Sequence, residues 1–583
     1  MGTMDKKGVA NILEEMGTLF EIKGDNPFKC RAYHNGARVV EALTEDIAEL
    51  VRNDRLKDVK GIGQGLADTI KDLVSTGTSK NYESLKSSLP PGLLDMVKIQ
   101  GLGPKRIKIL FEKLKITSIP ELKEACEKHR LAALDGFGEK TEENILKGIE
   151  LRTRVSDKHL YSEAKQSADE ILDTIRAMKE VRRCEVAGSL RRKKEIIGDI
   201  DIVVSADEKN RQKIFKVFVT HPSVESILGQ GETKASVVLK SGINCDMRIV
   251  NDAEYPFALN YFTGSKEHNV EMRSRARKVG WSLNEYEFSK VEGEKNVKRP
   301  PVCGEERDIY AALGLSYVPP ELREKTDEFE AAAQNKIPQL VEEKDLKGTF
   351  HCHTTASDGS NSLEEMAKAA RQLGWLYLGI ADHSKVAVYA NGLTPDRVKA
   401  QHKEIDALNK SSKNFRLFKG TEVDILADGS LDFTDKVLSS FDYVVASIHS
   451  KFKMTEAEAT KRVIKALKNK YVTMLGHPTG RLLLSRDGYP LNLVEVINAA
   501  SDYGKSIEIN AHPSRLDLDW RLVKYARDKK VKIAINPDAH NTDGLKDVRY
   551  GVGIARKGWL GPKDIVNCWS TKEVETFFRS AQS

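Results

Sequence analysis

The sequence predicts a multidomain protein with a helical N-terminal region, an α+β middle region and a C-terminal α/β barrel. Three observations predict this architecture. Glycine pairs recur at helix turns within residues 1–157, an Asp-x-Asp strand lies near residue 200, and His, Asp and Glu residues end successive apolar runs after residue 346. With 583 residues the chain is too long for one hydrophobic core, so several domains are expected.

The composition is that of an ordinary globular protein, with 40% hydrophobic and 31% charged residues. No apolar run approaches the roughly 20 residues that span a bilayer, so we expect no membrane association. The N-terminus, MGTMDKKGVA, lacks the apolar core and cleavage site of a signal peptide. Seven dispersed cysteines without CxxC pairs predict reduced thiols and a cytoplasmic location. We expect a monomer.

The net charge of +7 is a weak argument for nucleic-acid binding because of its distribution. Residues 1–350 hold 58 basic and 58 acidic side chains, whereas residues 351–583 hold 35 basic and 28 acidic ones. The DNA-binding hypothesis therefore depends on local motifs.

The N-terminal region contains the stretches VKGIGQGLADTI, IQGLGPKRIKIL and LDGFGEKTEENI. Each has a Gly-apolar-Gly turn before an amphipathic helix, which permits a tight turn and close approach of a partner. Amide groups at a helix N-terminus bind phosphate oxygens. One such turn is usually a simple connector, but three copies resemble the helix-hairpin-helix element and favour DNA backbone binding. The glycine pairs are Gly61 and Gly63, Gly101 and Gly103, and Gly136 and Gly138.

Three aspartates in the middle region predict a metal site. In GDIDIVV, Asp199 and Asp201 lie two residues apart and share one face of a strand. Asp246 lies on a later strand, after a hairpin turn at Ser241-Gly242. Such carboxylates repel one another unless a cation lies between them, and Mg²⁺ favours this ligation. A pair plus a distant third Asp is typical of two-metal phosphoryl transfer, although a strand edge with solvated Asp is the alternative.

Two further segments accompany the aspartates. Gly188-Ser189 and a basic run of Arg191, Arg192, Lys193 and Lys194 precede GDID. The stretch YFTGSKEHNVEMR follows Asp246 and begins a helix near Glu267. Asn269 and Arg273 are four residues apart and so lie on one helix face. Taken singly, these residues also fit an aromatic core pair and a polar helix face.

Together, GS, GDID, the third Asp, YFTGS, Asn269 and Arg273 resemble the family-X DNA polymerases, over roughly residues 1–317. The resemblance implies that Asp199, Asp201 and Asp246 hold two Mg²⁺ ions and are catalytic. It implies that the nucleotide is bound by Gly188, Ser189, Arg192, Tyr261, Phe262, Gly264, Lys266, Asn269 and Arg273. Within this set, Ser189 and Arg192 would hold the triphosphate, Tyr261 and Phe262 would lie against the sugar, and Asn269 and Arg273 would face the base pair and template.

The chain departs from the family at two positions. Lys266 stands where the polymerase beta pattern has Asp. Thr69 stands where lyase members carry their Schiff-base lysine, so we expect weak or absent deoxyribose-phosphate lyase activity.

The C-terminal region contains 8 of the 13 histidines. Short apolar runs end in a polar residue and alternate with amphipathic segments, which predicts the active-site edge of an α/β barrel. A lone HxH is more often a surface pair, but nine such residues predict a metal site. Imidazole with carboxylate suits Zn²⁺ or Mn²⁺, and nine ligands suggest up to three ions. The predicted ligands are His351, His353, Asp358, His383, Glu422, His449, His477, Asp538 and His540.

These nine positions resemble the PHP (polymerase and histidinol phosphatase) domain across residues 346–583, with no ligand missing. The resemblance implies a phosphoesterase that hydrolyses DNA 3′ ends. Two histidines fall outside the pattern: we interpret His402 as a solvated helix residue and His512 as a rim residue.

The sequence therefore predicts a DNA polymerase that fills short gaps in DNA repair, with a metal-dependent 3′-5′ exonuclease or 3′-end processing activity that extends to abasic sites. Its expected substrates are gapped or primer-template DNA and dNTPs. One alternative is a nucleotidyltransferase on another acceptor with a PHP small-molecule phosphatase, and another is a DNA-binding scaffold with a structural metal site. The expected divisions are 1–88 and 89–157 (helix-hairpin-helix), 158–253 (palm), 254–318 (thumb), 319–345 (linker) and 346–583 (PHP).

Overall fold

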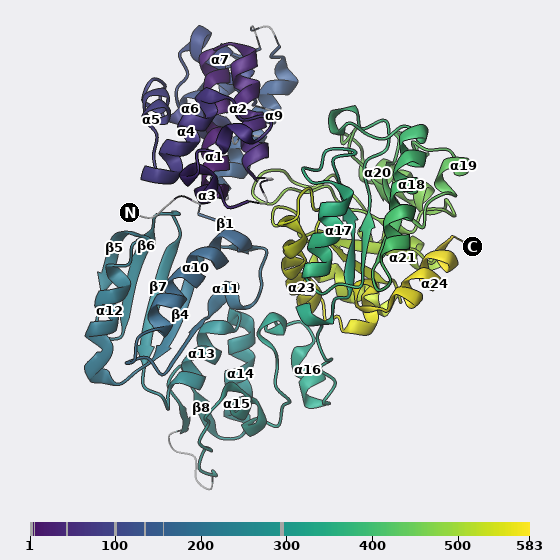
Figure 1. Cartoon of the computed structure of the whole chain (residues 1–583). Coiled ribbons are helices and arrows are strands. Elements are labelled where there is room, and N and C mark those ends of the chain that lie inside the picture. Colours follow the sequence, from purple (N-terminus) through teal and green to yellow (C-terminus); the bar gives the residue numbers. More distant parts are fainter. Residues whose placement is uncertain are drawn as a thin grey trace. The chain divides into compact units, whose positions relative to one another are not determined.

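The computed structural model describes residues 4, 6–41, 43, 45–97, 99, 102–132, 134, 136–154, 157–291 and 297–582. The chain divides into two compact units (Figure 1). The first is formed mainly by residues 1–156, and the second contains most of residues 157–583.

The first unit is helical, as predicted, and its helices enclose one apolar core that includes Leu13, Ile70 and Leu93. Its helices are α1 (Lys6–Lys23), α2 (Pro27–Glu41), α3 (Ile47–Arg52), η1 (Leu56–Asp58), α4 (Gln64–Thr76), α5 (Lys80–Ser87), α6 (Gly92–Val97), α7 (Pro104–Leu114), α8 (Ile119–Glu127) and α9 (Glu139–Arg154).

The glycine turns precede α4, α7 and α9 and share a geometry. Gly61 (φ +101°) and Gly136 (φ +81°) adopt the left-handed conformation that favours glycine, whereas Gly101 lies outside the described residues. A Cβ added at Gly63, Gly103 or Gly138 would meet nothing within 4 Å, so the backbone before each helix is open to a partner.

The second unit begins with a five-stranded sheet in the order β2-β4-β7-β6-β5, in which β4 and β7 are parallel. Ile200, Ile202 and Val204 face the core under α10, whereas Val203 faces α13. The short strands β1 (His159–Leu160) and β3 (Ile196–Ile197) pair beside it. The other elements are α10 (Tyr161–Arg176), β2 (Arg183–Val186), α11 (Gly188–Arg191), β4 (Asp199–Ser205), η2 (Glu208–Asn210), α12 (Arg211–Val219), β5 (Val224–Gln230), β6 (Lys234–Leu239) and β7 (Asn244–Val250).

A small α+β subdomain follows, with a core that includes Trp281, Ile309 and Phe329. The segment 319–345 is helical in part, as expected, and it also supplies Phe329 and Leu340 to this core. The elements are α13 (Tyr255–Thr263), α14 (Lys266–Lys278), β8 (Trp281–Leu283), β9 (Phe288–Lys290), α15 (Glu306–Ala312), η3 (Pro320–Leu322), α16 (Glu328–Ala333) and η4 (Glu343–Asp345).

The last part is a seven-stranded parallel sheet in sequence order, β10 to β16. A bridge between Cys352 and Ala539 brings its two edges together, so the sheet is a nearly closed barrel. The strands are β10 (Gly348–Cys352), β11 (Tyr377–Ile380), β12 (Arg416–Asp424), β13 (Tyr443–Ser447), β14 (Met474–Leu475), β15 (Ser506–Asn510) and β16 (Ile533–Asn536).

Helices surround this barrel (Figure 1). They are α17 (Leu363–Gln372), η5 (Val388–Ala390), α18 (Pro395–Ser411), α19 (Asp435–Leu438), α20 (Glu456–Leu467), α21 (Leu493–Asp502), α22 (Trp520–Asp528), η6 (Gly544–Asp547), α23 (Val548–Lys557), η7 (Pro562–Asp564), η8 (Val566–Cys568) and α24 (Thr571–Ala581).

Aromatic side chains from successive strands and from α24 form a buried cluster that includes Phe350, Phe418, Tyr443 and Phe578. Phe418, Gly420 and Glu422 are every second residue of β12 and therefore share one face of the strand. The apolar cluster thus lies on the same strand face as a predicted metal ligand, deeper in the barrel.

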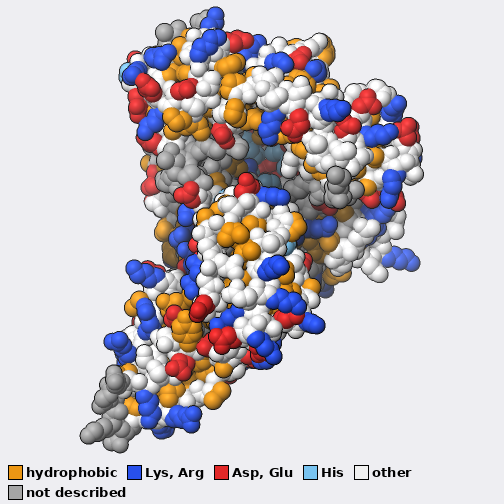
Figure 2. All heavy atoms as spheres, turned by 90° about the vertical axis from the view of Figure 1, so that its left-hand side faces the viewer, with side chains coloured by type: hydrophobic (Ala, Val, Ile, Leu, Met, Phe, Trp, Pro, Cys, Tyr) orange, Lys and Arg blue, Asp and Glu red, His pale blue; other side chains and the backbone are white. Residues whose placement is uncertain are grey.

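All seven cysteines are buried and unpaired. Within the described part of the chain, no helix has the combination of length and apolarity that a membrane crossing requires. On the face shown in Figure 2, Lys and Arg side chains are interspersed with Asp and Glu.

The tight packing at Gly420 generates a stability prediction. A Cβ there would collide with the ring of Tyr443 and the carbonyl of Ile380. We expect Gly420→Ala to destabilise the barrel by about 1–3 kcal/mol because a packed core cannot absorb an added methyl group. The measurement is thermal unfolding followed by circular dichroism. Gly229→Ala is the matched control, since an added Cβ there meets nothing within 4 Å. Equal melting temperatures for both variants would contradict the expectation.

Candidate active sites

The three predicted aspartates meet on the two parallel strands of the first sheet. The register of β4 and β7 places Asp201 directly beside Asp246, and Asp199 beside Asn244. Asp199 is exposed and the other two are half-buried. The strand alternation therefore brings three carboxylates to one place, as the sequence predicted.

Electrostatics indicates that this site suits a cation. Burial raises the pKa of Asp201 to about 7, and the charges of Asp199 and Asp246 add to the effect. The ammonium of Lys234 lies 2.6 Å from Asp246 and compensates part of this charge. Crowded, partly buried carboxylates of this kind fit divalent ions with oxygen ligands.

Gly188 lies against this cluster, and only glycine fits there. Its φ is +59°, and a Cβ would collide with the carboxylate of Asp201. The amide of Ala187 also donates to the carbonyl of Asp201 at 2.7 Å. Ser189 follows Gly188 in α11, so both predicted nucleotide-binding residues stay beside the aspartates.

Arg192 is less accessible than its predicted role suggests, with 9% of the residue exposed. Its Nε donates to Glu324 at 3.0 Å and its Nη1 donates to the carbonyl of Thr263 at 2.8 Å. The neighbouring Arg191 forms ion pairs with Glu306 instead, at 2.6 Å. Glu324 and the carbonyl of Thr263 therefore hold the guanidinium of Arg192 in place.

The YFTGS turn is organised by Asn269. Its Nδ2 donates to the carbonyls of Tyr261 at 2.7 Å and Gly264 at 3.3 Å. A Cβ at Gly264 would meet the Asn269 carboxamide oxygen at 2.6 Å, so this position requires glycine. The rings of Tyr261 and Phe262 contact each other edge to face. Two further predicted residues, Lys266 and Arg273, are exposed on α14.

The nine predicted ligands of the barrel also come together. They form four overlapping groups whose ligand atoms lie within 4.8 Å of one another. The groups are His353, Asp358, His383 and His540; His351, His353 and Asp538; His351, Glu422 and His477; and His383, Glu422 and His449. Each group supplies nitrogen and carboxylate atoms in a volume that fits one ion.

Glu422 is the centre of the cluster. Its carboxylate lies 2.8 Å from His477, 3.1 Å from His383 and 3.1 Å from His449. Burial opposes its charged form, but the imidazoles of His449 and His351 outweigh burial and hold the pKa of Glu422 well below its usual range. Burial lowers the pKa of His449, but the carboxylates of Glu422 and Asp424 outweigh burial and raise it to about 10.

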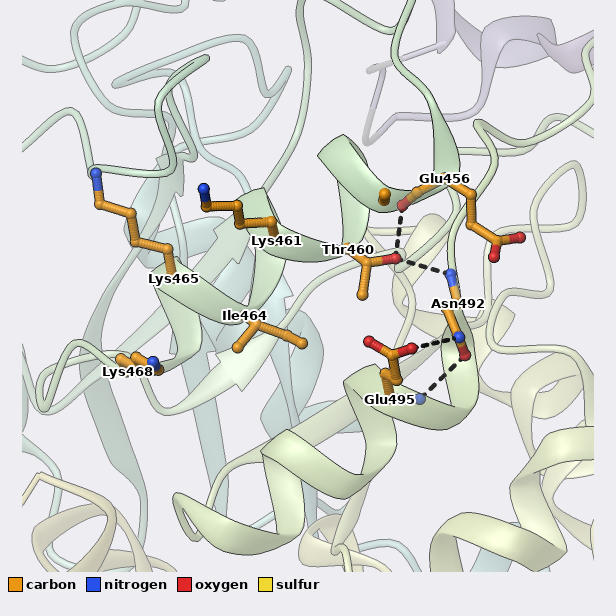
Figure 3. A pocket seen from close by; sticks show the side chains of 9 residues that line it. Glu456, Thr460, Lys461, Ile464, Lys465, Lys468, Asn492 and Glu495 are labelled. Carbon is orange, nitrogen blue, oxygen red and sulfur yellow. Dashed lines mark hydrogen bonds between the residues drawn. The ribbon is translucent and has the colours of Figure 1, made fainter.

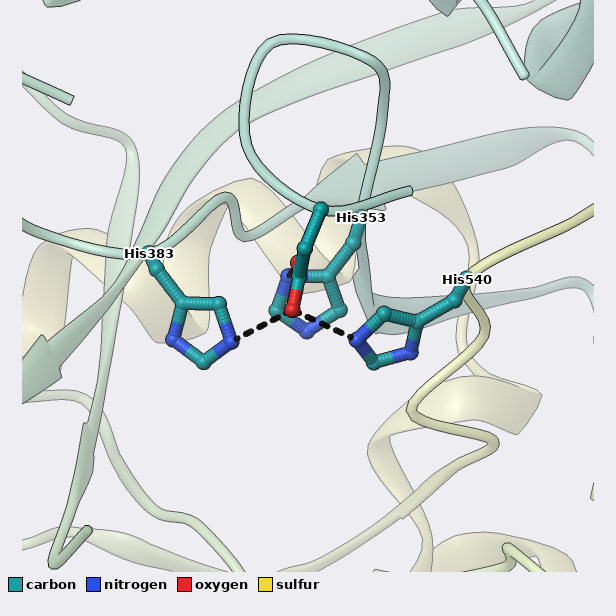
Figure 4. A group of neighbouring side chains, drawn as sticks. His353, His383 and His540 are labelled. Carbon is teal, nitrogen blue, oxygen red and sulfur yellow. Dashed lines mark ion pairs between the residues drawn. The ribbon is translucent and has the colours of Figure 1, made fainter. Parts of the chain in front are cut away.

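Asp358 is the carboxylate of the group that contains His353, His383 and His540. One of its oxygens lies 3.6 Å from His383 and 3.3 Å from His540, and both contacts are dashed in Figure 4. Figure 4 also shows His353 between these two imidazoles. Burial lowers the pKa of His540, but the hydrogen bond that its imidazole donates to Asp358 outweighs burial and raises this pKa to about 9. A single carboxylate therefore joins ligands from three strand ends.

Two structural observations show that the cluster fits metal ions. Among the nine predicted ligands, five buried imidazole nitrogens make no regular hydrogen bond, which is costly unless another group binds them. They are His351 Nε2, His353 Nδ1, His383 Nδ1, His449 Nδ1 and His477 Nδ1. His351 and Asp538 also adopt φ of +54° and +53°, a strained conformation that is common at functional sites.

Sequence reasoning missed the contribution of β15. Glu508 lies in this strand, is fully buried and contacts His351 Nδ1 at 2.6 Å. Asp424 similarly lies 3.3 Å from His449 Nδ1. A search of every barrel strand for a polar residue would have found Glu508, because β15 otherwise had no ligand. Each carboxylate lies beside the Nδ1 atom of its imidazole and can orient the ring.

Three residues at the periphery differ in exposure. His402 was expected to be solvated, but this was wrong: its ring packs edge to face on Phe441 at 4.9 Å, and burial lowers its pKa to about 4. His512 is exposed and contacts Ser514. Tyr389 was not predicted; it is 72% exposed, with its ring centroid 6.1 Å from that of His383.

A groove between α20 and α21 differs from the two clusters because lysine and glutamate side chains line it (Figure 3). Lys461, Lys465 and Lys468 line it, together with Glu456 and Glu495. It contains no histidine, and none of the residues that line it belongs to the two clusters above.

Known protein families match five parts of the chain. Residues 4–79 match a helix-hairpin-helix domain, 93–151 a SAM-like helix-hairpin-helix tandem, 161–242 the DNA polymerase beta palm, 258–324 the DNA polymerase beta thumb and 349–512 the PHP domain.

Individual relatives match either the whole chain or its barrel. The chain is 39% identical to the DNA polymerase/3′-5′ exonuclease PolX of Bacillus subtilis, over 99% of this chain and 100% of that protein. A probable phosphatase of Acetivibrio thermocellus is 32% identical over 33% of this chain and 78% of its own length. One of Caldicellulosiruptor bescii is 29% identical over 40% of this chain and 94% of its own length. The full-length relationship and the palm, thumb and PHP matches show that the chain belongs to the family-X DNA polymerases that carry a C-terminal PHP domain.

Proposed function

We propose that this protein is a DNA polymerase that extends 3′ ends on gapped or primer-template DNA with dNTPs, and that its PHP domain is a 3′-5′ exonuclease. The observation that carries the first activity is the pairing of Asp201 with Asp246 in register on parallel strands. The full-length similarity to a polymerase/3′-5′ exonuclease supports both activities.

In the polymerase site, Asp199, Asp201 and Asp246 would hold two Mg²⁺ ions, which would activate the attacking oxygen and stabilise the leaving group. Gly188 and Ser189 bring backbone close to these carboxylates, where the triphosphate would lie. The protein therefore supplies alignment of the 3′ end and the nucleotide, which accounts for most of catalysis in phosphoryl transfer.

Three further sets of residues would orient the substrates. Tyr261 and Phe262 would lie against the sugar, and Asn269 shapes the turn that carries them. Arg273, which is exposed on α14, would face the template. Lys266 would add a phosphate contact. The open turns at the hairpin glycines would bind the DNA backbone through helix N-terminal amides.

In the PHP site, the nine clustered ligands would hold up to three Zn²⁺ or Mn²⁺ ions, which would supply a nucleophile and stabilise charge on the phosphate. Glu508 and Asp424 orient the imidazoles of His351 and His449. The exposed ring of Tyr389 would offer a stacking surface for a terminal base. Cleavage at abasic sites is a further activity that such a site would support.

A second candidate is a small-molecule phosphatase in the PHP domain, because probable phosphatases match this part of the chain. Primer extension on gapped DNA, combined with release of nucleotides from labelled 3′ ends and hydrolysis of small phosphomonoesters, separates the candidates. Hydrolysis of phosphomonoesters without any cleavage of DNA would favour the second one.

The carboxylate cluster generates a prediction of opposite effects on activity and stability. We expect Asp201→Asn to lower primer extension by ~10²-fold or more because it removes a metal ligand. In EDTA the same variant should melt at a higher temperature, since burial, together with repulsion from Asp199 and Asp246, raises the pKa of Asp201 and makes its ionised form destabilising. The exposed Asp173→Asn is the control. Near-normal extension by Asp201→Asn would refute the metal assignment.

The PHP cluster generates a prediction of separable activities. We expect His351→Ala to abolish 3′-end hydrolysis and to leave primer extension nearly unchanged. Glu508→Gln should lower hydrolysis by ~10–100-fold, since it loosens the orientation of His351 without removing a ligand. Both assays are run on the same protein preparation, so extension reports folding. A parallel loss of extension and hydrolysis in a folded variant would indicate one shared site.

The first hairpin generates a prediction about lyase chemistry. Thr69 is buried and donates to the carbonyl of Gly65 at 2.9 Å. The side chain of Lys71 is 58% exposed and lies 3.9 Å from Asp54, so it points to solvent. Since a Schiff base requires a positioned, partly unprotonated amine, we expect weak or absent borohydride trapping on a nicked abasic substrate. A strong adduct that disappears in Lys71→Ala would contradict this argument.

A further inference from the structure

The PHP domain places a lysine inside the polymerase half of the second unit. Lys557 is the last residue of α23, and its side chain is fully buried. Its ammonium donates to Glu324 at 2.5 Å, to the backbone carbonyl of Glu321 at 3.3 Å and to the backbone carbonyl of Arg192 at 3.1 Å. The ring of Trp520 lies 4.4 Å away and covers the ammonium. Every contact of this cation is therefore internal, and one of them is made to Arg192.

Glu324 connects Lys557 to the side chain of Arg192. The same oxygen of Glu324 that accepts from Lys557 also accepts from Arg192 Nε at 3.0 Å. Its other oxygen lies 3.5 Å from the ammonium of Lys194. One carboxylate is thus shared by three cations, two from the palm and one from the PHP domain. Its side chain is 7% exposed, so solvent screens these charges only weakly.

The charge count around Glu324 has a consequence for Arg192. Without Lys557, Glu324 would be shared by Arg192 and Lys194 only, and the oxygen that now accepts from Lys557 would hold the guanidinium of Arg192 more tightly, away from an incoming anion. Lys557 withdraws part of that carboxylate charge and at the same time fixes the main chain of Arg192 through its carbonyl. Three cations and one carboxylate give the group a formal charge of +2, against +1 for two cations and one carboxylate without Lys557, and the larger positive charge favours the approach of a polyphosphate.

We propose that Lys557 is a positioning residue for nucleotide addition, through which the PHP domain keeps Arg192 available to the triphosphate of the incoming dNTP. The inference rests on the triphosphate role proposed above for Arg192. It assigns the PHP domain a structural part in the polymerase site, independent of the metal cluster in the barrel.

The test compares two neighbouring positions of α23. Lys557→Met removes the ammonium and retains an unbranched side chain. Arg556→Met is the matched control, because Arg556 bonds Glu321 at 2.7 Å and the carbonyl of Val341 at 2.9 Å at the same interface but does not contact Arg192. Steady-state extension of gapped DNA by the full-length variants gives kcat and KM for the dNTP.

We expect Lys557→Met to raise the KM for dNTP by about tenfold, the effect of one charge-assisted hydrogen bond, with a smaller change in kcat. Arg556→Met should keep KM within about twofold, since the hydrogen bonds of Arg556 go to Glu321 and Val341 and not to Arg192 or Glu324. Hydrolysis of 3′ ends should stay unchanged in both variants, which also verifies folding of the barrel. An equal rise of KM in both variants would overturn the proposal, because it would indicate a general effect of domain docking.

A double variant tests the electrostatic cause. In Lys557→Met, Glu324 is shared only by Arg192 and Lys194 and restrains Arg192 more strongly, so adding Glu324→Gln should return KM toward the wild-type value. Absence of this rescue would overturn the proposal. Arg192→Gln tests the triphosphate role of Arg192 separately from the positioning role of Lys557. An unchanged KM in this variant would remove the proposed triphosphate role, whereas a raised KM there with a normal KM in Lys557→Met would remove only the role of Lys557.

Discussion

Burial of carboxylates sets the main constraint on this protein, since each buried acid must be met by opposing charges or by several donors. Glu422 lies among imidazoles at the centre of the ligand cluster, and Glu306 joins Arg191 to Arg323. In the N-terminal unit, Glu142 accepts from two backbone amides at 2.8 and 2.9 Å. Glu422 and Glu306 join segments that are distant in the sequence, whereas Glu142 joins residues 10 and 11 positions away. The same interactions that satisfy buried charge therefore also determine which elements lie together.

The barrel separates stability from chemistry along its strands. Phe418 and Gly420 lie deep in the barrel against the aromatic cluster, and Glu422 follows on the same face of β12 at the ligand cluster. Parallel strands bring their C-terminal ends to one edge, so seven short segments can each add a polar residue to a single site. Strain at His351 and Asp538 is tolerated because the aromatic layer and the neighbouring strands hold these positions.

The polymerase site is built on a different principle. Only two strands supply the carboxylates, and their parallel register brings Asp201 and Asp246 together. The nucleotide side of the site depends on turns, with Gly188 close to Asp201 and Gly264 close to Asn269. A site made from turns needs support from outside the sheet. Here the support includes ionic groups from the thumb and, as proposed, from the PHP domain.

The sequence by itself determined the order of domains and nearly all of the candidate site residues. Periodicity and glycine spacing sufficed for the hairpins, and GDID and the His, Asp and Glu residues at strand ends carry their chemistry in short local patterns. Local patterns cannot report partners that are distant in the chain. Glu508 looked like an ordinary strand residue until β15 was placed beside His351. His402 looked like a solvated helix residue until Phe441 covered its ring. The shared contacts of Glu324 with Arg192 and Lys557 likewise depend on tertiary structure, because 233 residues separate Glu324 from Lys557 and only the packing of α23 brings them within hydrogen-bond distance.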